Sequence, residues 1–430
     1  MNPLRTEPQR LQDIADRLAG YDPNTLAVAQ AQAFIAALVP TVQGVEQLPL
    51  RSALGRVLAQ PILSPLDVPS HDNSAMDGYA LRGQDLRSDG PTELKIAGKG
   101  LAGLQFEGTV APGECVRITT GAVMPTGLDT VVPQEFATVV NGVVRVEPGV
   151  VRPGDNRRLA GEDLAKGAVA LAQGRLLTAS DLGVAASLGR AELPVRRRLR
   201  VAFFSTGDEL RSLGETLDTG CVYDSNRYTI WGMLQRLGFV DLIDMGVVRD
   251  NAAALTAAFE QASQCADAII TSGGVSVGEA DHTKQVMAAL GDVAFWRIAM
   301  RPGRPMAIGR LHGGTVLFGL PGNPVAVMVT FYAFVRGALL QMAGVQGLPP
   351  VLLKARCQTP LRKKPGRTEY QRGIVTRGSD GQWEVRITGA QGSGILSSMS
   401  AANGLVILPH ESGSVNTGDW VDVWPFEGLI

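Results

Sequence analysis

The stretch from residue 64 to 81 gathers side chains that are able to do chemistry. It reads Ser-Pro-Leu-Asp-Val-Pro-Ser-His-Asp-Asn-Ser-Ala-Met-Asp-Gly-Tyr-Ala-Leu and carries three carboxylates, those of Asp67, Asp72 and Asp77. Its apolar residues do not recur at helical spacing, and Asn, Ser and Asp side chains hydrogen-bond to nearby backbone groups. We therefore predict a fixed polar loop that presents carboxylates. An ordinary surface turn is the alternative for a run of this composition.

A second set of candidates follows predicted strands in the middle of the chain. Three polar or glycine-rich loops come directly after such strands: 205–209, 272–281 and 319–324. Ligands bind beyond the carboxyl ends of an open parallel sheet, and glycine-rich loops and helix N-termini favour anions. The sequence therefore predicts a phosphate site with candidates Ser272, Gly273, Gly274, Ser276 and Asn323. Asn323 also suits a helix N-cap, with Pro324 at the first helical position.

Carboxylates accumulate at the same predicted sheet edge: Glu209, Asp250, Glu279 and Asp281. They would repel phosphate unless a divalent cation lay between them. A helix cap is the structural alternative for Asp250 and for Asp281, which precede predicted helices. Several carboxylates at one edge favour a metal-phosphate site, and their oxygen ligands suit Mg²⁺ or another divalent cation.

Composition excludes several other classes. The net charge is −1, with 40 basic and 41 acidic residues, which argues against nucleic-acid binding by overall charge. No stretch approaches the roughly 20 apolar residues of a membrane helix, and the N-terminus does not read as a secretory signal. The four cysteines and four histidines are scattered, so a zinc site of thiolates and imidazoles is not expected. We predict reduced thiols, a cytoplasmic location and no membrane partner.

The chain is too long for a single core, and its patterns change along its length. We predict a multidomain protein of the α/β plus β class. The expected segments are 1–63, an N-terminal helical and linking part of an elongated domain; 64–164, a β-rich inserted domain; 165–198, the return of the elongated domain; 199–346, an α/β domain; and 347–430, a C-terminal β-barrel or sandwich.

The α/β prediction rests on alternating patterns. Apolar strands are expected at 201–204, 240–245, 268–271 and 316–318, and helices near 226–237, 251–264, 281–290 and 324–342. This alternation indicates a mostly parallel sheet covered by helices. Further helices are expected at 25–39 and 178–189. Two motifs are set aside: 98–103 fits the dinucleotide fingerprint but no helix follows it, and the basic run 196–200 is expected to be a solvated linker edge.

The wording of residues 72–80 resembles the signature loop of the molybdopterin molybdenumtransferases, the family that includes the C-terminal domain of gephyrin. Further matches stand in the family's order at 117–121, 156–163, 207–209, 273–281, 320–324 and 366–370, so the resemblance covers roughly residues 25–425. It implies four domains, the α/β one binding molybdopterin. It also implies a homodimer, with a cleft between the α/β domain of one subunit and β domains of the other.

By the same resemblance, the expected function is insertion of molybdenum from molybdate into adenylylated molybdopterin. The adenylate would be hydrolysed and AMP released, with Mg²⁺ or another divalent cation as cofactor. Molybdopterin adenylyltransferase and molybdoenzyme apoproteins are expected partners. The candidate catalytic residues are Asp77, Thr120, Asp163, Glu209 and Asp281, the substrate-binding candidates are Arg158, Ser272, Gly273, Gly274, Ser276, Arg297, Arg301, Arg304 and Asn323, and the candidate metal ligands are Glu209, Asp250 and Asp281. The resemblance implies a role in activity for those at matching positions, which are Asp77, Thr120, Arg158, Asp163, Glu209, Asp250 and Asp281.

The chain departs from the family at one place. Where the family often has lysines, this sequence has Arg297, Arg301 and Arg304. Arginine keeps the charge and offers a planar fork that suits phosphate or molybdate, but it does not donate a proton as a general acid. An anion-binding role is therefore expected of these residues rather than proton transfer. The alternatives for the whole protein are an adenylyltransferase-like enzyme and a non-catalytic scaffold on the same fold.

Overall fold

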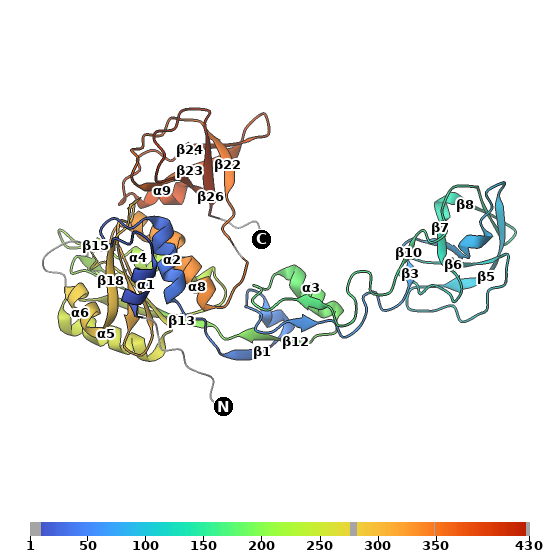
Figure 1. Cartoon of the computed structure of the whole chain (residues 1–430), viewed down its shortest axis with the longest axis horizontal. Helices are drawn as coiled ribbons and strands as arrows, with labels where there is room; N and C mark the ends of the chain where they lie inside the picture. The colour runs from blue at the N-terminus through green and yellow to red at the C-terminus, as the bar shows by residue number, and fades with distance from the viewer. Residues whose placement is uncertain (1–9, 276–281, 348, 427–430) are drawn as a thin grey trace. The chain divides into compact units, whose positions relative to one another are not determined.

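The structure is a computed structural model that describes residues 10–275, 282–347 and 349–426 (Figure 1). The chain divides into two compact units. Unit 1 comprises Met1–Ala59, Gly174–Thr178 and Pro194–Ile430, and unit 2 comprises Gln60–Gln173 and Ala179–Leu193. The chain thus leaves unit 1 after residue 59, touches it again at Gly174–Thr178 and returns to it at Pro194. Each unit has hydrophobic clusters of its own and is described separately below.

A six-stranded sheet forms the centre of unit 1, in the order β16-β13-β17-β21-β20-β18. The first four strands are parallel to one another, whereas β20 is antiparallel to both of its neighbours. The predicted mostly parallel sheet is therefore confirmed, with an edge that the sequence patterns did not reveal. The strands are β13 (Leu199–Thr206), β16 (Val240–Val248), β17 (Ala268–Ser272), β18 (Gly291–Arg297), β20 (Pro305–Leu311) and β21 (Val316–Leu320).

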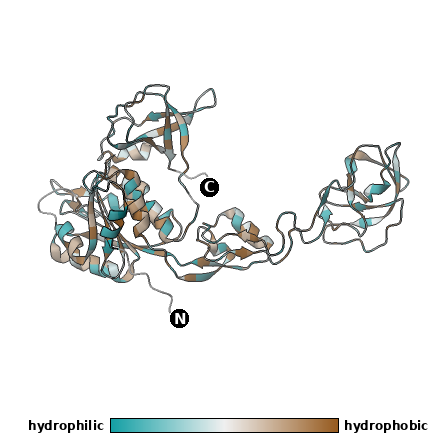
Figure 2. Cartoon of the chain, in the orientation of Figure 1, coloured by the Kyte–Doolittle hydropathy of each residue, from teal (hydrophilic) through white to brown (hydrophobic). Residues whose placement is uncertain are grey.

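Alternate residues of these strands enter two different cores, because successive side chains of a strand point to opposite faces of the sheet. Val201 and Phe203 of β13 belong to the larger core, and Ala202 and Phe204 belong to the other. The helices are α1 (Leu11–Arg17), α2 (Val28–Leu38), α4 (Asn226–Gln235), α5 (Ala252–Cys265), α6 (His282–Leu290), α7 (Pro324–Thr330) and α8 (Arg336–Met342). Figure 2 shows hydrophobic residues concentrated on the sheet and on helices beside it.

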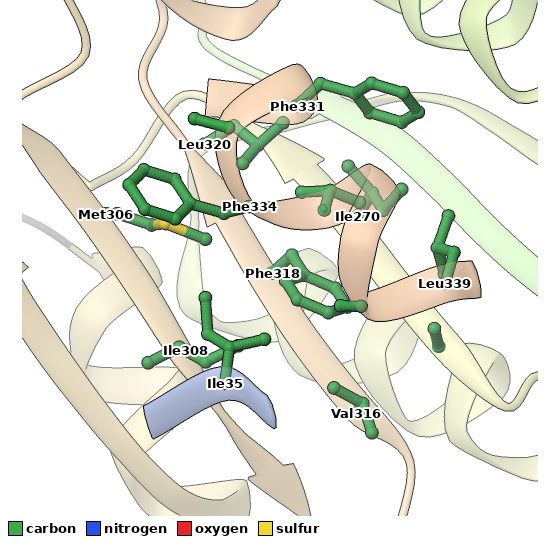
Figure 3. Packing of buried hydrophobic residues seen from close by; sticks show 14 of the residues in the cluster. Ile35, Ile270, Met306, Ile308, Val316, Phe318, Leu320, Phe331, Phe334 and Leu339 are labelled. Carbon is green, nitrogen blue, oxygen red and sulfur yellow. The ribbon is translucent and has the colours of Figure 1, made fainter. Parts of the chain in front are cut away.

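A continuous helix runs from α7 to α8 through a π-helical turn, η4 (Phe331–Val335). Its 19 residues have a mean hydropathy of 1.6, long and apolar enough to cross a membrane, so the expectation that no stretch approaches that length was wrong. Most of it, 72%, is buried within the protein, as in the core helix of a globular unit. Phe331, Phe334 and Leu339 from this helix belong to the same core as residues of the sheet and Ile35 of α2 (Figure 3).

Truncating Phe318 in this core is expected to cost about 3–5 kcal/mol of unfolding free energy, because the side chain is fully buried and Ala leaves a cavity. All five tryptophans lie in unit 1, so tryptophan fluorescence during denaturant unfolding follows that unit. Phe136→Ala is the matched control, since Phe136 is 58% exposed and lies in unit 2. Equal midpoints for Phe318→Ala and the unsubstituted protein would show that this packing contributes little.

The C-terminal part of unit 1 is a closed barrel of five strands, in the order β23-β24-β22-β26-β25 with β25 pairing back to β23. This arrangement decides between the barrel and the sandwich that the sequence left open. The longest strand, β23, was not predicted, because Glu, Gln and Arg interrupt its apolar pattern. The elements are β22 (Leu353–Cys357), β23 (Thr368–Arg377), β24 (Trp383–Ile387), α9 (Leu396–Ala401), β25 (Gly404–Leu408) and β26 (Trp420–Pro425), with β19 (Met300–Arg301) paired to β23.

Unit 2 contains a six-stranded sheet in the order β7-β4-β6-β5-β9-β8. The fingerprint-like residues 98–100 end strand β5 and no helix follows them, which removes the dinucleotide motif. The elements are β2 (Ile62–Leu63), β3 (Asn73–Ser74), β4 (Gly78–Leu81), η2 (Gly83–Asp85), β5 (Thr92–Gly100), β6 (Glu114–Ile118), β7 (Thr130–Pro133), η3 (Gln134–Phe136), β8 (Ala137–Val140), β9 (Val143–Val146), β10 (Arg157–Arg158), β11 (Val169–Leu171) and α3 (Ala179–Ser187).

The basic run at 196–198 stabilises unit 1 and is not a solvated edge as expected. Arg196 donates to the backbone oxygen of Val42 at 2.7 Å, and Arg197 forms a two-pronged ion pair with Asp267, at 2.7 Å for both hydrogen bonds. Burial raises the pKa of Asp267, but the hydrogen bonds from Arg197 and from the Arg200 backbone outweigh burial and hold that pKa below its usual value. The remaining elements of this region are β1 (Val45–Pro49), η1 (Leu50–Ala53), β12 (Glu192–Arg196), β14 (Leu210–Arg211) and β15 (Val222–Tyr223).

Candidate active site

A pocket of about 640 Å³ lies in unit 1, at the carboxyl ends of β13, β17 and β21. The barrel supplies part of its lining, through residues that follow β24 and precede β23. Parallel strands of this kind place their following loops at one edge of the sheet, where ligands bind. The lining residues are 206–207, 209, 250, 273–274, 300–305, 321–323, 326, 367 and 391–393.

The acidic lining consists of Glu209 and Asp250. Asn251, not Asp250, caps helix α5, since its Oδ1 accepts a hydrogen bond from the Ala254 backbone at 2.9 Å. The cap alternative for Asp250 is thereby removed, and its carboxylate contacts only the Thr283 hydroxyl, at 3.5 Å, among the described residues. A Cβ at Gly207 would lie 2.6 Å from Glu209 Oε2, so the glycine lets this carboxylate fold back over the loop.

The glycine loop after β17 closes tightly on its neighbours. Gly273 and Gly274 have φ angles of +97° and +65°, in the region that favours glycine. A Cβ at Gly273 would meet the Thr206 backbone oxygen at 2.3 Å, and one at Gly274 would meet the Thr283 hydroxyl at 2.2 Å. Any side chain would therefore disturb the wall of the pocket. The predicted residues Ser276 and Asp281 lie outside the described residues.

The basic lining consists of Arg301, Arg304 and Arg367. None of these three guanidinium groups has a hydrogen-bond or ion-pair partner within the described part of the chain. Three unpaired positive charges beside two carboxylates make a site for an anion, or for an anion together with a cation. Arg297 is not among the lining residues; its side chain is exposed, and its backbone N–H donates to the Pro23 oxygen.

Ser272 and Asn323, which were both expected to bind phosphate, differ in their access to the pocket. Ser272 is buried, and its hydroxyl accepts a hydrogen bond from Asn226 Nδ2 at 2.7 Å, while the same amide nitrogen donates to the Gly322 oxygen. Ser272 thus ties two of the loops together. Asn323 stands at the N-cap of α7 with Pro324 following it, yet its side chain makes no capping hydrogen bond and instead lines the pocket.

The site includes a loop that the sequence analysis missed, residues 389–393. The guanidinium of Arg372, which is 1% exposed, donates to the backbone oxygens of Ala390, Gln391 and Gly392 and through Nε to Ser398 Oγ. It thereby fixes the segment that brings Gln391 and Ser393 to the pocket. An arginine inside an unpredicted strand gave no signal for this role, whereas Arg367 lay within a motif already matched to the family.

The remaining predicted residues lie in unit 2, where Asp77 and Thr120 are in direct contact. The backbone N–H and the hydroxyl of Thr120 donate to Asp77 Oδ1 at 2.7 and 2.9 Å. These two hydrogen bonds hold the pKa of Asp77 below its usual value. Arg158 lies on β10, where it pairs with Asn73 of β3, and the backbone N–H of Asp163 donates to the Val68 oxygen.

Asp72 anchors the same loop. It accepts a hydrogen bond from the Ala160 backbone at 2.8 Å and pairs with Arg157, with Nε at 2.8 Å. The Ala160 hydrogen bond and the Arg157 guanidinium lower the pKa of Asp72. The carboxylates of this stretch hold residues 157–166, since Asp67 also accepts from the Lys166 backbone. The predicted fixed polar loop is confirmed for most of residues 64–77, whereas Asn73–Ser74 form the short strand β3 and Gly78–Leu81 form strand β4.

Replacing Thr120 by Val is expected to raise the pKa of Asp77, because the hydroxyl hydrogen bond is lost while the backbone one remains. Carboxyl carbon NMR titration measures this pKa directly. Thr120→Ser is the matched control and should leave the pKa near that of the unsubstituted protein. An unchanged pKa in Thr120→Val would show that the hydroxyl does not stabilise the ionised carboxylate.

The described residues fit a divalent cation in part. No group of three His, Cys, Asp or Glu side chains able to hold a metal occurs among residues 10–275, 282–347 and 349–426. Glu209 and Asp250 nevertheless bring carboxylates to one pocket, and neither has a basic partner in the part of the chain that the structure describes. Two carboxylates completed by phosphate oxygens and water form the kind of site that Mg²⁺ occupies.

Comparison with known proteins agrees with this fold and site. Three family descriptions match successive parts of the chain: "MoeA N-terminal region (domain I and II)" at residues 26–189, "Probable molybdopterin binding domain" at 202–341 and "MoeA C-terminal region (domain IV)" at 354–426. A crystal structure of the molybdopterin biosynthesis moeA protein from Pyrococcus horikoshii OT3 superposes with a TM-score of 0.81 and 28% identity. The match covers 94% of this chain and all of that one.

Curated relatives extend the match over the full length. The molybdopterin molybdenumtransferase of Haemophilus influenzae is 41% identical over 94% of this chain and 100% of its own length, and that of a Nostoc species is 36% identical over 97% of both chains. Gephyrin of Dictyostelium discoideum is 30% identical over 87% of this chain. This chain belongs to the molybdopterin molybdenumtransferase family, and the resemblance noted in the sequence is confirmed.

Proposed function

We propose that this protein is an enzyme of molybdenum cofactor biosynthesis that inserts molybdenum into molybdopterin. Relatives that match this chain over nearly their whole length are named for this activity. The single structural observation that supports it best is the pocket of unit 1, whose lining combines two carboxylates and a glycine loop with three arginines that have no ion-pair partner among the described residues. An oxyanion and a phosphorylated ligand are the chemical partners that such a lining favours.

The finer chemistry is part of the proposal. The substrate is taken to be adenylylated molybdopterin, whose phosphates would lie against Gly273, Gly274 and Asn323. Arg301 and Arg304 would hold phosphate or molybdate oxygens through two-pronged hydrogen bonds. Water would cleave the bond between the pterin phosphate and AMP, and the negative charge that develops on the leaving phosphate would be stabilised by the fixed guanidinium groups.

Mg²⁺ is the proposed cofactor, and Glu209 and Asp250 are its proposed ligands, with Asp281 as a third candidate from the sequence. When bound, the cation would neutralise phosphate charge and polarise the phosphorus-oxygen bonds. Without the cation, the two carboxylates would repel the substrate phosphates. The carboxylates would therefore act on the ligand through the cation, whereas the arginines would contact its oxygens directly. In unit 2, Asp77 with Thr120, together with Arg158 and Asp163, stay proposed functional residues of the family.

A homodimer is also proposed. Exposed apolar side chains are concentrated on one continuous segment of unit 1, and exposed apolar surface of this kind favours association. Their exposed fractions lie between 44% and 60%, at Leu213, Leu217, Val222, Tyr223, Tyr228 and Trp231. A twofold partner placed on this segment would cover them. A cytoplasmic location is proposed from the same family membership.

Light scattering at micromolar concentration should give about twice the 45.4 kDa chain mass. Leu213→Asp and Trp231→Asp are expected to shift the protein toward the monomer, because a charge in an apolar interface is not solvated. Leu104→Asp is the control, since Leu104 is 65% exposed but lies in unit 2. A monomeric unsubstituted protein would exclude the dimer.

The proposed function is tested by activating a molybdenum enzyme that lacks its cofactor. The apoenzyme is mixed with adenylylated molybdopterin, molybdate and Mg²⁺, with and without this protein. The proposal predicts that enzyme activity appears quickly only in the complete mixture. Equal activation without this protein would contradict an insertase function.

A further inference from the structure

The segment that opens helix α4, residues 224–226, contacts three neighbouring parallel strands of the unit 1 sheet near their carboxyl ends. These strands are β13, β17 and β21, and the loops that follow them line the pocket. Asp224 and Asn226 make the contacts, and both are buried, with exposed fractions of 2% and 8%. Neither residue lines the pocket itself. The segment therefore lies behind the pocket and reaches all three of these loops from one place.

Asp224 joins this segment to β13. Its Oδ1 accepts a hydrogen bond from the Ser205 hydroxyl at 2.9 Å and another from the Arg227 backbone N–H at 3.2 Å. The Arg227 guanidinium donates to Oδ2 of the same carboxylate, with Nε at 3.3 Å. A buried carboxylate that accepts several hydrogen bonds is held in one position. Because Ser205 directly precedes Thr206 and Gly207 of the lining, Asp224 fixes the start of the loop that carries Glu209.

Asn226 joins the same segment to β17 and β21. Its Nδ2 donates to the Ser272 hydroxyl and to the Gly322 backbone oxygen, at 2.7 Å in both cases. Ser272 directly precedes Gly273 of the glycine loop, and Gly322 itself lines the pocket. An amide nitrogen has two hydrogens to donate, so Asn226 uses both on the two loops proposed to hold phosphate.

Buried polar atoms without partners are found at the same strand ends. Oδ1 of Asn226, Oγ1 of Thr206 and Oγ1 of Thr271 have no hydrogen-bond partner in the part of the chain that the structure describes. Unpaired buried polar atoms cost stability, so apolar side chains would be expected here if the segment served packing alone. The retained polar groups favour a role in the function of the pocket.

We propose that Asp224 and Asn226 are positioning residues, which hold three loops of the pocket in one arrangement by fixing the start of α4 to all three strand ends. They act through these loops and do not touch the substrate. Without the Asn226 amide, loops 273–274 and 321–323 would lose their common tie, and the phosphate-binding groups would no longer be arranged before the substrate arrives. The expected effect on catalysis rests on the proposed function, whereas the expected effect on the loops does not.

The first test is amide hydrogen exchange of the full chain without substrate, which reports local opening. Asn226→Ala removes two hydrogen bonds and should speed exchange by about tenfold or more in loops 273–274 and 321–323. Exchange in strand β16, which lies outside these contacts, should stay as in the unsubstituted protein. Ser272→Ala removes one of the two hydrogen bonds and should have a smaller effect on the same loops. This milder variant also tests the proposal if Asn226→Ala does not fold.

Thr315→Val is the matched control. The Thr315 hydroxyl is buried and also donates to two backbone oxygens, those of Ala266 and Ser263, at 3.1 and 3.3 Å. Thr315 lies just before β21, at the opposite end of that strand from Gly322. Its replacement should lower the thermal unfolding midpoint as Asn226→Ala does, but it should leave exchange in the pocket loops unchanged.

The second test is the kinetics of AMP release. Asn226→Ala should lower kcat/KM for adenylylated molybdopterin roughly 10- to 100-fold, with a raised KM, because the phosphate-binding loops are misplaced. The Mg²⁺ concentration for half-maximal rate should stay the same, since Glu209 and Asp250 are unaltered. A loss of stability alone would reduce the amount of folded enzyme and so lower the apparent kcat, but it would not change KM.

Unchanged exchange of both pocket loops in Asn226→Ala, or in Ser272→Ala if only that variant folds, would overturn the proposal. Equal effects of Asn226→Ala and Thr315→Val on loop exchange would overturn it as well. These outcomes are separate from the proposed function. A protein that releases no AMP, but whose pocket loops exchange faster in Asn226→Ala, would keep the positioning role and refute the insertase. An active protein whose loops are unaffected would do the reverse.

Discussion

Arg301→Ala is expected to lower kcat/KM for molybdenum insertion roughly 30- to 900-fold. This corresponds to a loss of about 2–4 kcal/mol of transition-state stabilisation. Arg301 lines the pocket without a carboxylate partner among the described residues, so its charge is available to the ligand. Arg301→Lys keeps the charge but loses the planar fork, and should retain part of the activity. The measurement is steady-state AMP release over a range of molybdate concentrations.

Arg297→Ala is the matched control for this prediction. Sequence alone placed Arg297 beside Arg301 as a second anion ligand, but it does not line the pocket. It is therefore expected to lose much less activity than Arg301→Ala. Equal losses in the Ala and Lys variants of Arg301 would indicate that shape rather than charge matters. Full activity in Arg301→Ala would remove the anion-binding role.

Replacing Glu209 by Gln, or Asp250 by Asn, is expected to weaken the binding of Mg²⁺ to the pocket. Each change replaces a carboxylate by a neutral amide of the same shape, which is a poorer ligand for Mg²⁺. The Mg²⁺ concentration for half-maximal AMP release should rise by on the order of tenfold or more, about 1.4 kcal/mol. Both carboxylates line an open pocket and neither has a basic partner in the described residues, so both variants should fold.

Glu260→Gln is the control for the metal prediction, because Glu260 is an exposed carboxylate of helix α5 that does not line the pocket. Its Mg²⁺ dependence should match that of the unsubstituted protein. If Glu209→Gln and Asp250→Asn lose activity at every Mg²⁺ concentration with no shift of the midpoint, the carboxylates act on the substrate and do not hold the cation.

Sequence patterns predicted the parallel core of the α/β sheet well, because its strands are apolar and each is followed by a polar or glycine-rich loop. They also placed Glu209, Asp250, Gly273 and Gly274 at one edge, and these residues do line one pocket. The exact residue at which a strand ends is harder to predict from sequence. Ser272 is the last residue of strand β17 and is buried, so it holds neighbouring loops together and does not line the pocket.

Long-range polar contacts limited the prediction elsewhere. Arg372 lies on β23 and its partners in loop 390–392 follow β24, so the contact depends on the pairing of these two strands and no local pattern encodes it. The choice between Asp250 and Asn251 as helix cap depended on which side chain met the Ala254 backbone, and both residue types are good caps. Arg196 and Arg197 looked like a surface run because their partners, Val42 and Asp267, are distant in sequence.

The most direct test of the central claim is to incubate the protein with adenylylated molybdopterin, molybdate and Mg²⁺, and to measure AMP together with molybdenum bound to the pterin. We expect both products to appear in equal amounts, to depend on molybdate and Mg²⁺, and to fall sharply in Arg301→Ala. AMP release without molybdenum insertion would indicate an adenylate-cleaving relative, and the absence of both products under these conditions would contradict the enzyme and favour a scaffold.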